Sequence, residues 1–293
     1  MVILNSDLKA IAILAYQSLI AEVQLAPKPG LVDPESNGAH DDMDYPLFLK
    51  SIAALKAYLL AYIEAGYQST SDQQLFLTLR QIGQDAEKQM LLATSQINTH
   101  KGANFSYAFI LGAIGRAGQT LTLSKLVEQN FKPVFEIIRN MTKGLVSRDF
   151  SQITDKTQLS YGEQLYVEYG FTGIRGEAEA GYPSLEYIAL PTLQKYRMLP
   201  EDDRHLLLML TLMTEVQDMN LVHRGGIDGW QMVQKVAAEI LQETDDMVLV
   251  RRKLRQFDAQ LIEAHLSPGG TADLLSLGIF LERLKYSMAT QKA

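Results

Sequence analysis

ANFSYAFILGAIGRA, residues 103–117, is a run of small and apolar side chains that carries no charge before Arg116. It is long enough for about four turns of α-helix. Gly112 and Gly115 lack side chains and therefore let a second helix pack closely, although each glycine costs a helix about 1 kcal/mol relative to alanine. The segment predicts a buried helix at the centre of the fold.

Helix-forming patterns continue on both sides of this segment. Apolar residues recur at spacings of three and four from Leu8 to Leu19, which is the pattern of an amphipathic helix. Pro46 suits the first turn of the next helix, and Gly66 is expected to be its carboxy-terminal cap. Further helices are predicted at residues 72–92, 133–144, 155–169, 201–218, 230–241 and 247–265, from Pro183, and after Ser267.

These patterns define the expected fold class. Because no window shows sustained period-two alternation, we expect an all-α fold of roughly ten helices. No stretch rich in glycine, serine or proline divides the chain, so residues 1–293 are expected to form a single compact domain. With 47% hydrophobic residues, the chain can bury a substantial core.

The composition excludes several classes of protein. A formal net charge of -7 argues against a general nucleic-acid binder, because such affinity comes from an excess of lysine and arginine. Without cysteine the chain has no disulfide, thiolate nucleophile or Cys-ligated zinc. The most apolar run, residues 206–213, is far shorter than the roughly 20 residues of a membrane-spanning helix. No secretion signal is recognisable, so we expect a cytoplasmic protein that does not bind membranes.

Five polar clusters interrupt the helical pattern, at residues 27–44, 98–102, 173–181, 218–229 and 267–273. They combine cations, carboxylates and amides with glycines that let backbone N–H groups approach a ligand. A site for a polyphosphate and its metal requires this combination of groups. The recurrence predicts that several helix ends converge on one anionic substrate, with the active site at these ends and loops.

The first cluster presents Lys28 on a stiff turn formed by Pro27, Pro29 and Gly30. Downstream carboxylates in a loop can converge on Mg²⁺, which favours carboxylate oxygens and water. The alternative is an exposed polar connection that ends at the start of the next helix. The candidate residues here are Lys28, Gly30, Asp33, His40, Asp42 and Asp44.

The second and third clusters suggest phosphate contacts. Residues 98–102 precede a helix, where free N–H groups and the helix dipole favour anions, although an ordinary cap explains them equally. Arg175 lies between glycines and suits bidentate phosphate binding, with Glu177 available for metal or hydroxyl chemistry; the alternative is a surface Arg–Glu pair. The candidates are Asn98, Thr99, His100, Lys101, Gly102, Arg175, Gly176 and Glu177.

The fourth cluster follows the most apolar helix and is therefore expected to be anchored by a buried element. In the fifth, capping explains Ser267, but Gly269 and Gly270 weaken a helix and suggest close approach of a ligand. The candidates from both are Asp218, Asn220, His223, Arg224, Gly225, Gly226, Ser267, Gly269, Gly270 and Asp273.

The clusters in their order resemble the triphosphoribosyl-dephospho-coenzyme A synthase family. The resemblance rests on PKPGLVD at 27–33, GAH at 38–40 with DMD at 42–44, NTHKG at 98–102, RGEA at 175–178, Asn220 with HRGG at 223–226, and SPGG at 267–270 with ADL at 272–274. Each motif alone is weak. Together they cover nearly the whole chain.

The resemblance implies a helical enzyme that joins ATP to 3'-dephospho-coenzyme A, releases adenine, and makes the precursor of the prosthetic group of citrate lyase acyl carrier protein. A related branch serves malonate decarboxylase, and the motifs do not separate the two. The product is expected to pass to a carrier-protein transferase, for which this chain has no room. The 2'-hydroxyl would displace adenine through a transition state with oxocarbenium character.

On this interpretation we assign roles to the candidates. Lys28, Lys101, Arg175 and Arg224 bind phosphates, and the other candidate loop residues complete the substrate site. Mg²⁺ is expected on Asp42, Asp44, Asp218 and Asp273. Glu177 is the expected base, and His100 or His223 protonates or orients the departing adenine.

Two alternatives remain open at this point. The adjacent His40 and Asp41 suggest a metal-dependent helical phosphohydrolase, although the other ligands lack a convincing spacing. A non-catalytic nucleotide-sensing module would use the same phosphate contacts. The sequence leaves the oligomeric state open.

Overall fold

The structure is a computed structural model that describes residues 5–150, 159 and 161–290. All regular structure in these residues is helical, which confirms the expected all-α class. The elements are α1 (Asn5–Gln24), α2 (Tyr45–Gln68), α3 (Asp72–Ala93), α4 (Lys101–Ala117), α5 (Leu123–Glu128), α6 (Lys132–Thr142), α7 (Leu145–Phe150), α8 (Tyr161–Tyr169), α9 (Gly173–Glu179), the π-helix η1 (Ser184–Ala189), α10 (Leu190–Lys195), α11 (Glu201–Glu215), α12 (Met219–Glu243), α13 (Met247–Glu263) and α14 (Gly269–Thr290).

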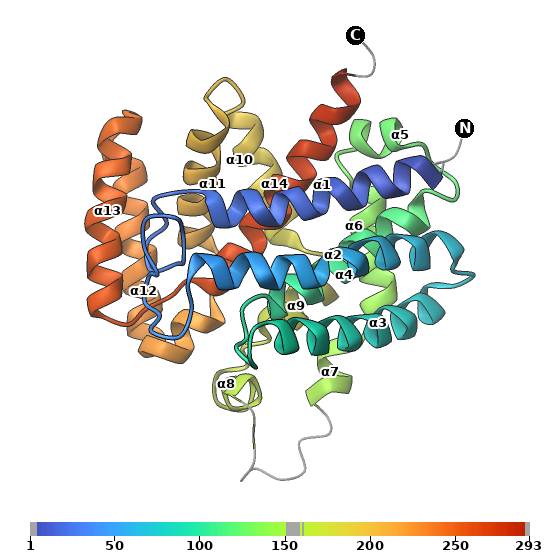
Figure 1. Cartoon of the computed structure of the whole chain (residues 1–293), viewed down its shortest axis with the longest axis horizontal. Helices are drawn as coiled ribbons and strands as arrows, with labels where there is room; N and C mark the ends of the chain where they lie inside the picture. Colours follow the sequence, from blue (N-terminus) through green and yellow to red (C-terminus); the bar gives the residue numbers. More distant parts are fainter. Residues whose placement is uncertain (1–4, 151–158, 160, 291–293) are drawn as a thin grey trace.

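The helices form one body around a continuous hydrophobic core. In Figure 1, α1 and α2 run antiparallel across the front, α4 lies behind α2, and α12 with α13 forms the left end. α14 packs against α1 and α11. The core extends from Leu8 in α1 to Leu284 in α14, so the first and last described helices share one interior.

α4 is the central helix that residues 103–117 predict. A side chain at Gly115 would place its Cβ only 2.0 Å from the Ile63 carbonyl oxygen in α2. Gly66 of α2 and Gly112 of α4 meet in the same way, since a Cβ at Gly66 would lie 1.9 Å from the Gly112 carbonyl oxygen. The expected close packing is confirmed, but the prediction that Gly66 caps α2 is wrong. α2 continues to Gln68 and is capped by Ser69, because Gly66 serves the contact with α4.

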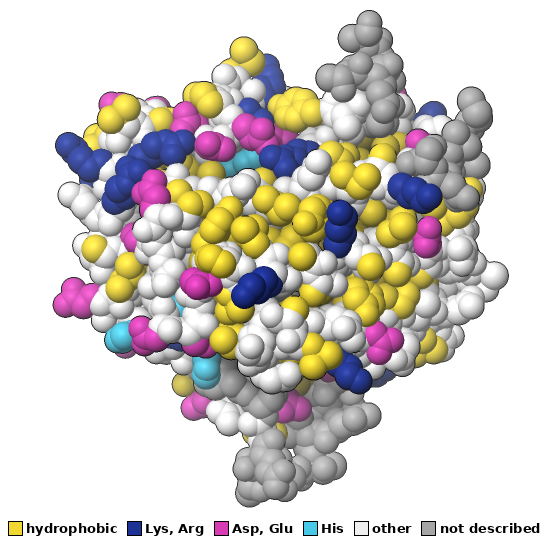
Figure 2. All heavy atoms as spheres, viewed as in Figure 1, with side chains coloured by type: hydrophobic (Ala, Val, Ile, Leu, Met, Phe, Trp, Pro, Cys, Tyr) yellow, Lys and Arg dark blue, Asp and Glu magenta, His cyan; other side chains and the backbone are white. Residues whose placement is uncertain are grey.

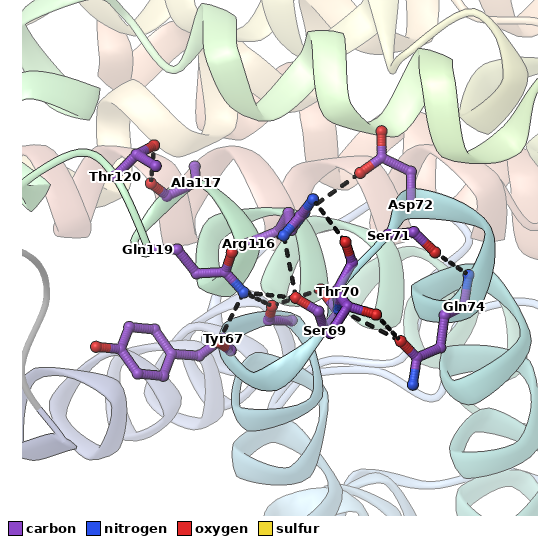
Figure 3. Close-up of polar contacts among 11 residues, drawn as sticks. Tyr67, Ser69, Thr70, Ser71, Asp72, Gln74, Arg116, Ala117, Gln119 and Thr120 are labelled. Carbon is purple, nitrogen blue, oxygen red and sulfur yellow. Dashed lines mark hydrogen bonds and ion pairs between the residues drawn. The ribbon is translucent and has the colours of Figure 1, made fainter.

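The carboxy-terminal end of α4 holds the turn between α2 and α3 (Figure 3). Gln119 donates to the carbonyl oxygens of Gly66, Tyr67 and Ser69. Arg116 donates to the Ser69 carbonyl at 3.0 Å and pairs with Asp72 at 3.4 Å. These contacts satisfy carbonyl groups that the end of α2 leaves unpaired.

Several predicted boundaries differ from the structure. The cluster at 218–229 is not a loop but the first part of α12, which is interrupted at Gly226 by a non-helical backbone (φ 66°, ψ -169°). The cluster at 173–181 forms the short helix α9. After Pro183 the chain makes η1 and then α10. The helix expected at 155–169 is seen as α8, and residues 155–158 and 160 of that prediction lie outside the described residues.

The outer face of α1 and α2 is apolar. Figure 2 shows a band of apolar side chains across the middle of this face. Ile13 of α1 is about half exposed. α2 is apolar and long enough to cross a membrane by length and composition alone. It carries Lys50, Lys56 and Glu64, and its inner face packs on α4 through Tyr62, so it is best understood as a core helix.

Candidate active site

One cavity of about 580 Å³ collects residues from all five polar clusters. Its volume is in the range of small-molecule binding pockets. The polar and charged lining residues are Glu22, His40, Asn98, Thr99, His100, Lys101, Thr172, Arg175, Glu177, Gln217, Asn220, His223, Arg224, Ser267 and Asp273. Apolar side chains line it as well, among them Leu31, Val32, Phe48, Phe150, Phe171 and Met219. The expected convergence of helix ends is therefore present.

His100 lies at the start of α4 and is buried. Its Nδ1 is 2.7 Å from the Ser51 hydroxyl of α2, and Thr99 donates to the same hydroxyl at 2.6 Å. Its Nε2 has no hydrogen-bond partner among the described residues. Burial, reinforced by the nearby charge of Lys28, lowers the pKa of His100 to about 3. The ring is therefore neutral at physiological pH.

Lys28 does not reach the cavity directly. Its Nζ lies 2.5 Å from the Glu22 carboxylate of α1, and both side chains are buried. Glu22 lines the cavity, and burial raises its pKa against the opposing charge of Lys28. Glu22 is not among the residues predicted from the sequence. The available signal was a carboxylate three residues after Leu19 on the apolar stripe of the first helix.

Two buried aspartates anchor helix starts. Asp218 caps α12 by accepting the Asn220 N–H at 2.9 Å, and it also accepts the backbone N–H of Thr271 in α14 at 2.7 Å. Asp273 accepts the Ala103 N–H at the start of α4, and its Oδ2 lies where a Cβ of Gly102 would be. Burial raises the pKa of Asp218 and raises that of Asp273 well above its usual value. The positive end of α4 is thus partly filled by a carboxyl group of the protein.

Glu177 projects from α9 into the cavity. Its Oε1 accepts the Ser184 hydroxyl at 2.6 Å, and the Ser184 backbone N–H lies 3.4 Å from Oε2. Burial raises the pKa of Glu177 above the ordinary value of 4.5. No cation pairs with this carboxylate in the described part of the chain.

The cations of the cavity differ in how they are held. Arg224 donates to the carbonyl oxygens of Ala39 and His265 and lies 3.1 Å from Nδ1 of His40. Arg175 pairs with Asp149 at 2.8 Å, and Lys101 pairs with Glu87 at 2.7 Å. Since the fixed contacts of Arg224 are to uncharged groups, its charge remains available to an anion.

His40 connects two of the clusters. Its Nε2 lies 2.9 Å from the hydroxyl of Ser267, and its Nδ1 faces Arg224. Burial and the charge of Arg224 lower the pKa of His40. This contact fixes the loop before α2 against the start of α14. The two segments of the cavity wall therefore keep a constant position relative to each other.

A second hollow, of about 560 Å³, lies between α1, α11 and α14. Its charged side chains are paired with one another, Arg204 with Glu282 and Arg283 with Glu201. It receives none of the five clusters. The chemistry that the clusters suggest therefore belongs to the first cavity.

Comparison with known proteins agrees with this geometry. Residues 8–291 match the family described as CitG: ATP:dephospho-CoA triphosphoribosyl transferase. The chain belongs to this family. It is 42% identical over 297 residues to a protein of Streptococcus mutans named "Probable 2-(5''-triphosphoribosyl)-3'-dephosphocoenzyme-A synthase", with 96% of this chain and 99% of the relative covered. A protein of the same name from Streptococcus pyogenes serotype M5 is 42% identical over 290 residues, covering 94% and 98%. No solved structure matches the chain.

Most residues that the triphosphoribosyl transferase resemblance selected line the cavity. They are His40, Asn98, Thr99, His100, Lys101, Gly102, Arg175, Glu177, Asn220, His223, Arg224, Ser267, Gly269, Gly270 and Asp273. The selected residues outside its lining are Lys28, Gly30, Asp33, Asp42, Asp44, Gly176, Asp218, Gly225 and Gly226.

The residues outside the lining have structural contacts instead. Gly30 adopts a φ of +70°, and a side chain there would meet the Leu266 carbonyl. Asp33 accepts the backbone N–H groups of its own loop, including that of Lys28 at 2.8 Å. Gly176 lies against Thr172, and Gly225 against Leu266. Gly30 and Asp33 therefore shape the loop before α2, and Gly176 in α9 and Gly225 in α12 allow close packing.

The four aspartates expected to hold Mg²⁺ do not form one site. Asp44 caps α2 by accepting the Leu47 N–H at 2.8 Å, which is the alternative that the sequence left open. Asp42 is largely exposed beside His40, and Asp218 and Asp273 are occupied at helix starts. Among the described residues, no group of three or more His, Asp or Glu side chains can hold a metal ion. The donor set does not fit an ion held by the protein alone.

Proposed function

We propose that this chain transfers the 5-triphosphoribosyl group of ATP to the 2'-hydroxyl of 3'-dephospho-coenzyme A. The observation that carries the proposal is the match to the triphosphoribosyl transferase family along residues 8–291. The cavity supports it, because the motifs that define the resemblance converge there. The products are adenine and 2'-(5''-triphosphoribosyl)-3'-dephospho-coenzyme A.

The reaction needs one bond exchange at the ribose of ATP. The oxygen of the 2'-hydroxyl forms a bond to C1', and the bond from C1' to N9 of adenine breaks. The hydroxyl proton is taken by a base, and a proton is added to the departing adenine, so the overall reaction balances. The new C1'–O bond forms on the face of C1' opposite to the C1'–N9 bond that breaks, as in inverting glycoside transfer.

Glu177 is the proposed base. Burial raises its pKa, which makes the carboxylate a better proton acceptor than an exposed glutamate. Its fixed contacts are the hydrogen bonds from Ser184, so lone pairs remain for a substrate hydroxyl. Of the other buried carboxylates of the cavity, Glu22 is held by Lys28 and Asp273 by the backbone N–H of Ala103.

Arg224, Arg175 and Lys101 are the proposed phosphate contacts. Hydrogen bonds between a guanidinium and a phosphate are short and strong, and the planar donor can bind two oxygens. Lys28 acts indirectly by compensating the charge of Glu22 at the cavity wall. Mg²⁺ would be held by the oxygens of the triphosphate, which are its usual ligands, and would neutralise part of the phosphate charge.

Three further proposals concern the domain organisation, the fate of the product and the cellular compartment. We propose that residues 1–293 are one domain, since the core extends from α1 to α14. The product would be the prosthetic-group precursor for citrate lyase acyl carrier protein and would be passed to a carrier-protein transferase. An ATP-dependent biosynthetic enzyme without cysteine fits the cytoplasm.

The test is substrate-dependent release of adenine. Purified protein is incubated with ATP, with dephospho-coenzyme A, and with both, and adenine and inorganic phosphate are quantified by chromatography. The proposal predicts adenine only when both substrates are present, and no phosphate. Phosphate release would instead support the phosphohydrolase alternative. Binding of ATP without any turnover would support a sensing module.

A further inference from the structure

A chain of hydrogen bonds ends on a buried histidine that faces the cavity. Thr99 donates its hydroxyl proton to Ser51 at 2.6 Å, and the Ser51 hydroxyl lies 2.7 Å from Nδ1 of His100. Ser51 and His100 are almost completely buried, at 0% and 4% exposed. The opposite ring nitrogen, Nε2, has no partner in the described residues. A buried polar atom without a partner is rare in folded proteins, so Nε2 is available to a ligand group.

With Thr99 donating to Ser51, the hydrogen-bond pattern favours one tautomer. A serine hydroxyl has one proton to donate, and Ser51 already accepts the proton of Thr99. If Ser51 donates to Nδ1, both hydroxyl protons have an acceptor, because Thr99 donates to Ser51 and Ser51 donates to the ring. The proton of the neutral ring must then be on Nε2. In the reverse arrangement Ser51 would accept twice, and its own proton would lack an acceptor among the described residues. The first arrangement is the satisfied one.

We propose that Ser51 and Thr99 are positioning residues that hold neutral His100 with its proton on Nε2, so that this N–H donates a hydrogen bond to the nucleobase of ATP. This inference rests on the proposed function, since it names the part of the nucleotide that His100 meets. It also ranks the histidines: His100 orients adenine as a donor and does not serve as its general acid.

The surroundings of His100 favour an uncharged ligand group. The edge of the Phe48 ring packs against the imidazole, with ring centroids 4.9 Å apart. Burial and Lys28 keep the imidazole neutral, so it offers no charge to a phosphate. Of the three proposed phosphate contacts, Arg175 and Arg224 lie on other elements of the cavity wall. Lys101, which follows His100, is exposed and paired with Glu87. A ring nitrogen of adenine is an acceptor without charge and matches the Nε2–H donor.

The tautomer can be measured directly in the free protein. Long-range ¹H–¹⁵N correlation spectra of ¹⁵N-histidine-labelled protein distinguish the two neutral tautomers and the cation, and His100→Gln identifies the signals of His100. We expect the neutral Nε2–H pattern, unchanged between pH 8 and pH 6. An Nδ1–H pattern, or titration of His100 within this range, would overturn the proposal.

Matched variants test the positioning role. Thr99→Val removes the hydroxyl at nearly constant shape, and Thr99→Ser retains it. We expect Thr99→Val to mix the His100 tautomers and to lower kcat for adenine release about tenfold, with KM for dephospho-coenzyme A unchanged. Thr99→Ser should restore the single tautomer. Ser51→Ala should act like Thr99→Val. If Thr99→Val and Ser51→Ala fold but keep the wild-type spectrum, the hydrogen-bond chain has no positioning role.

Two small probes separate the nucleobase from the phosphates. Free adenine should shift the His100 Nε2–H signal, whereas inorganic tripolyphosphate should leave it in place. The opposite response would assign His100 to phosphate and contradict the proposal. These spectra do not require turnover. If adenine release fails while the Nε2–H tautomer is observed, the proposed function falls and the tautomer assignment stands.

Discussion

Glu177 differs from the other buried carboxylates of the cavity in what holds it. Glu22 is paired with Lys28, and Asp273 accepts the backbone N–H of Ala103 at the start of α4. Glu177 accepts only the hydroxyl and, at longer range, the N–H of Ser184 in the described structure. A buried carboxylate without a cation has a raised pKa and spare lone pairs, which are the properties of a base.

Replacing Glu177 with glutamine tests this role at the scale of one residue. The amide keeps the shape but cannot accept a proton, so we expect Glu177→Gln to lower kcat by about 10²- to 10⁴-fold with little change in ATP affinity. Because burial raises the pKa of Glu177, wild-type kcat should fall on the acid side at a pH above its ordinary value of 4.5. The residual activity of the variant should lack this acid limb. Steady-state adenine release between pH 5 and 8 and calorimetric ATP binding provide the two readouts.

The matched control is Glu239→Gln, an exposed glutamate of α12 that is far along the helix from the cavity residues. Its kcat and pH profile should equal those of the wild type. A Glu177→Gln variant that also matches the wild type would remove Glu177 from the reaction.

At the scale of elements, the contact between α2 and α4 holds the site, because α4 begins at the cavity and α2 supplies Ser51 and Phe48. Gly115 is one of the tightly constrained points of this contact. Gly115→Ala would place a methyl group 2.0 Å from the Ile63 carbonyl, and backbone cannot swing aside as a side chain can. We expect a loss of about 1–3 kcal/mol in the free energy of unfolding, measured by urea denaturation.

Gly83→Ala is the control for this prediction. Gly83 lies within α3, and its nearest neighbour for a new Cβ is the Tyr62 hydroxyl at 3.8 Å, an ordinary contact. Alanine is favoured over glycine in a helix by about 1 kcal/mol, so this variant should be as stable as the wild type or more so. Equal destabilisation by both substitutions would contradict the close-packing account of Gly115.

The elements also show how far the sequence could be read. Local signals predicted α4, the Pro46 start of α2 and the Ser267 start of α14, because apolar periodicity and caps act within a few residues. Gly66 was misjudged, since its role depends on Gly112, which lies 46 positions away in the sequence and in another helix. Residue type alone also did not separate loop-shaping Asp33 and Asp44 from residues that line the cavity. Glu22 was missed because its ion pair with Lys28 forms only when the chain folds.

For the whole molecule, the difference between the overall charge and the charges inside the cavity explains how an acidic chain can bind a polyphosphate. The net charge of -7 is spread over a surface whose long-range effect is screened beyond about 8 Å at physiological salt. The cavity gathers Lys101, Arg175 and Arg224 from three different helices. We therefore expect these local cations, and not the overall charge, to set the affinity for the substrate.

The most direct test of this account follows the ribose of ATP. ATP labelled with ¹³C in its ribose is incubated with dephospho-coenzyme A and the purified protein, and the products are analysed by mass spectrometry. We expect unlabelled adenine and an equal amount of a dephospho-coenzyme A derivative that carries the labelled ribose and all three phosphates. Labelled ribose that stays attached to adenine, or a product that has lost phosphate, would contradict it.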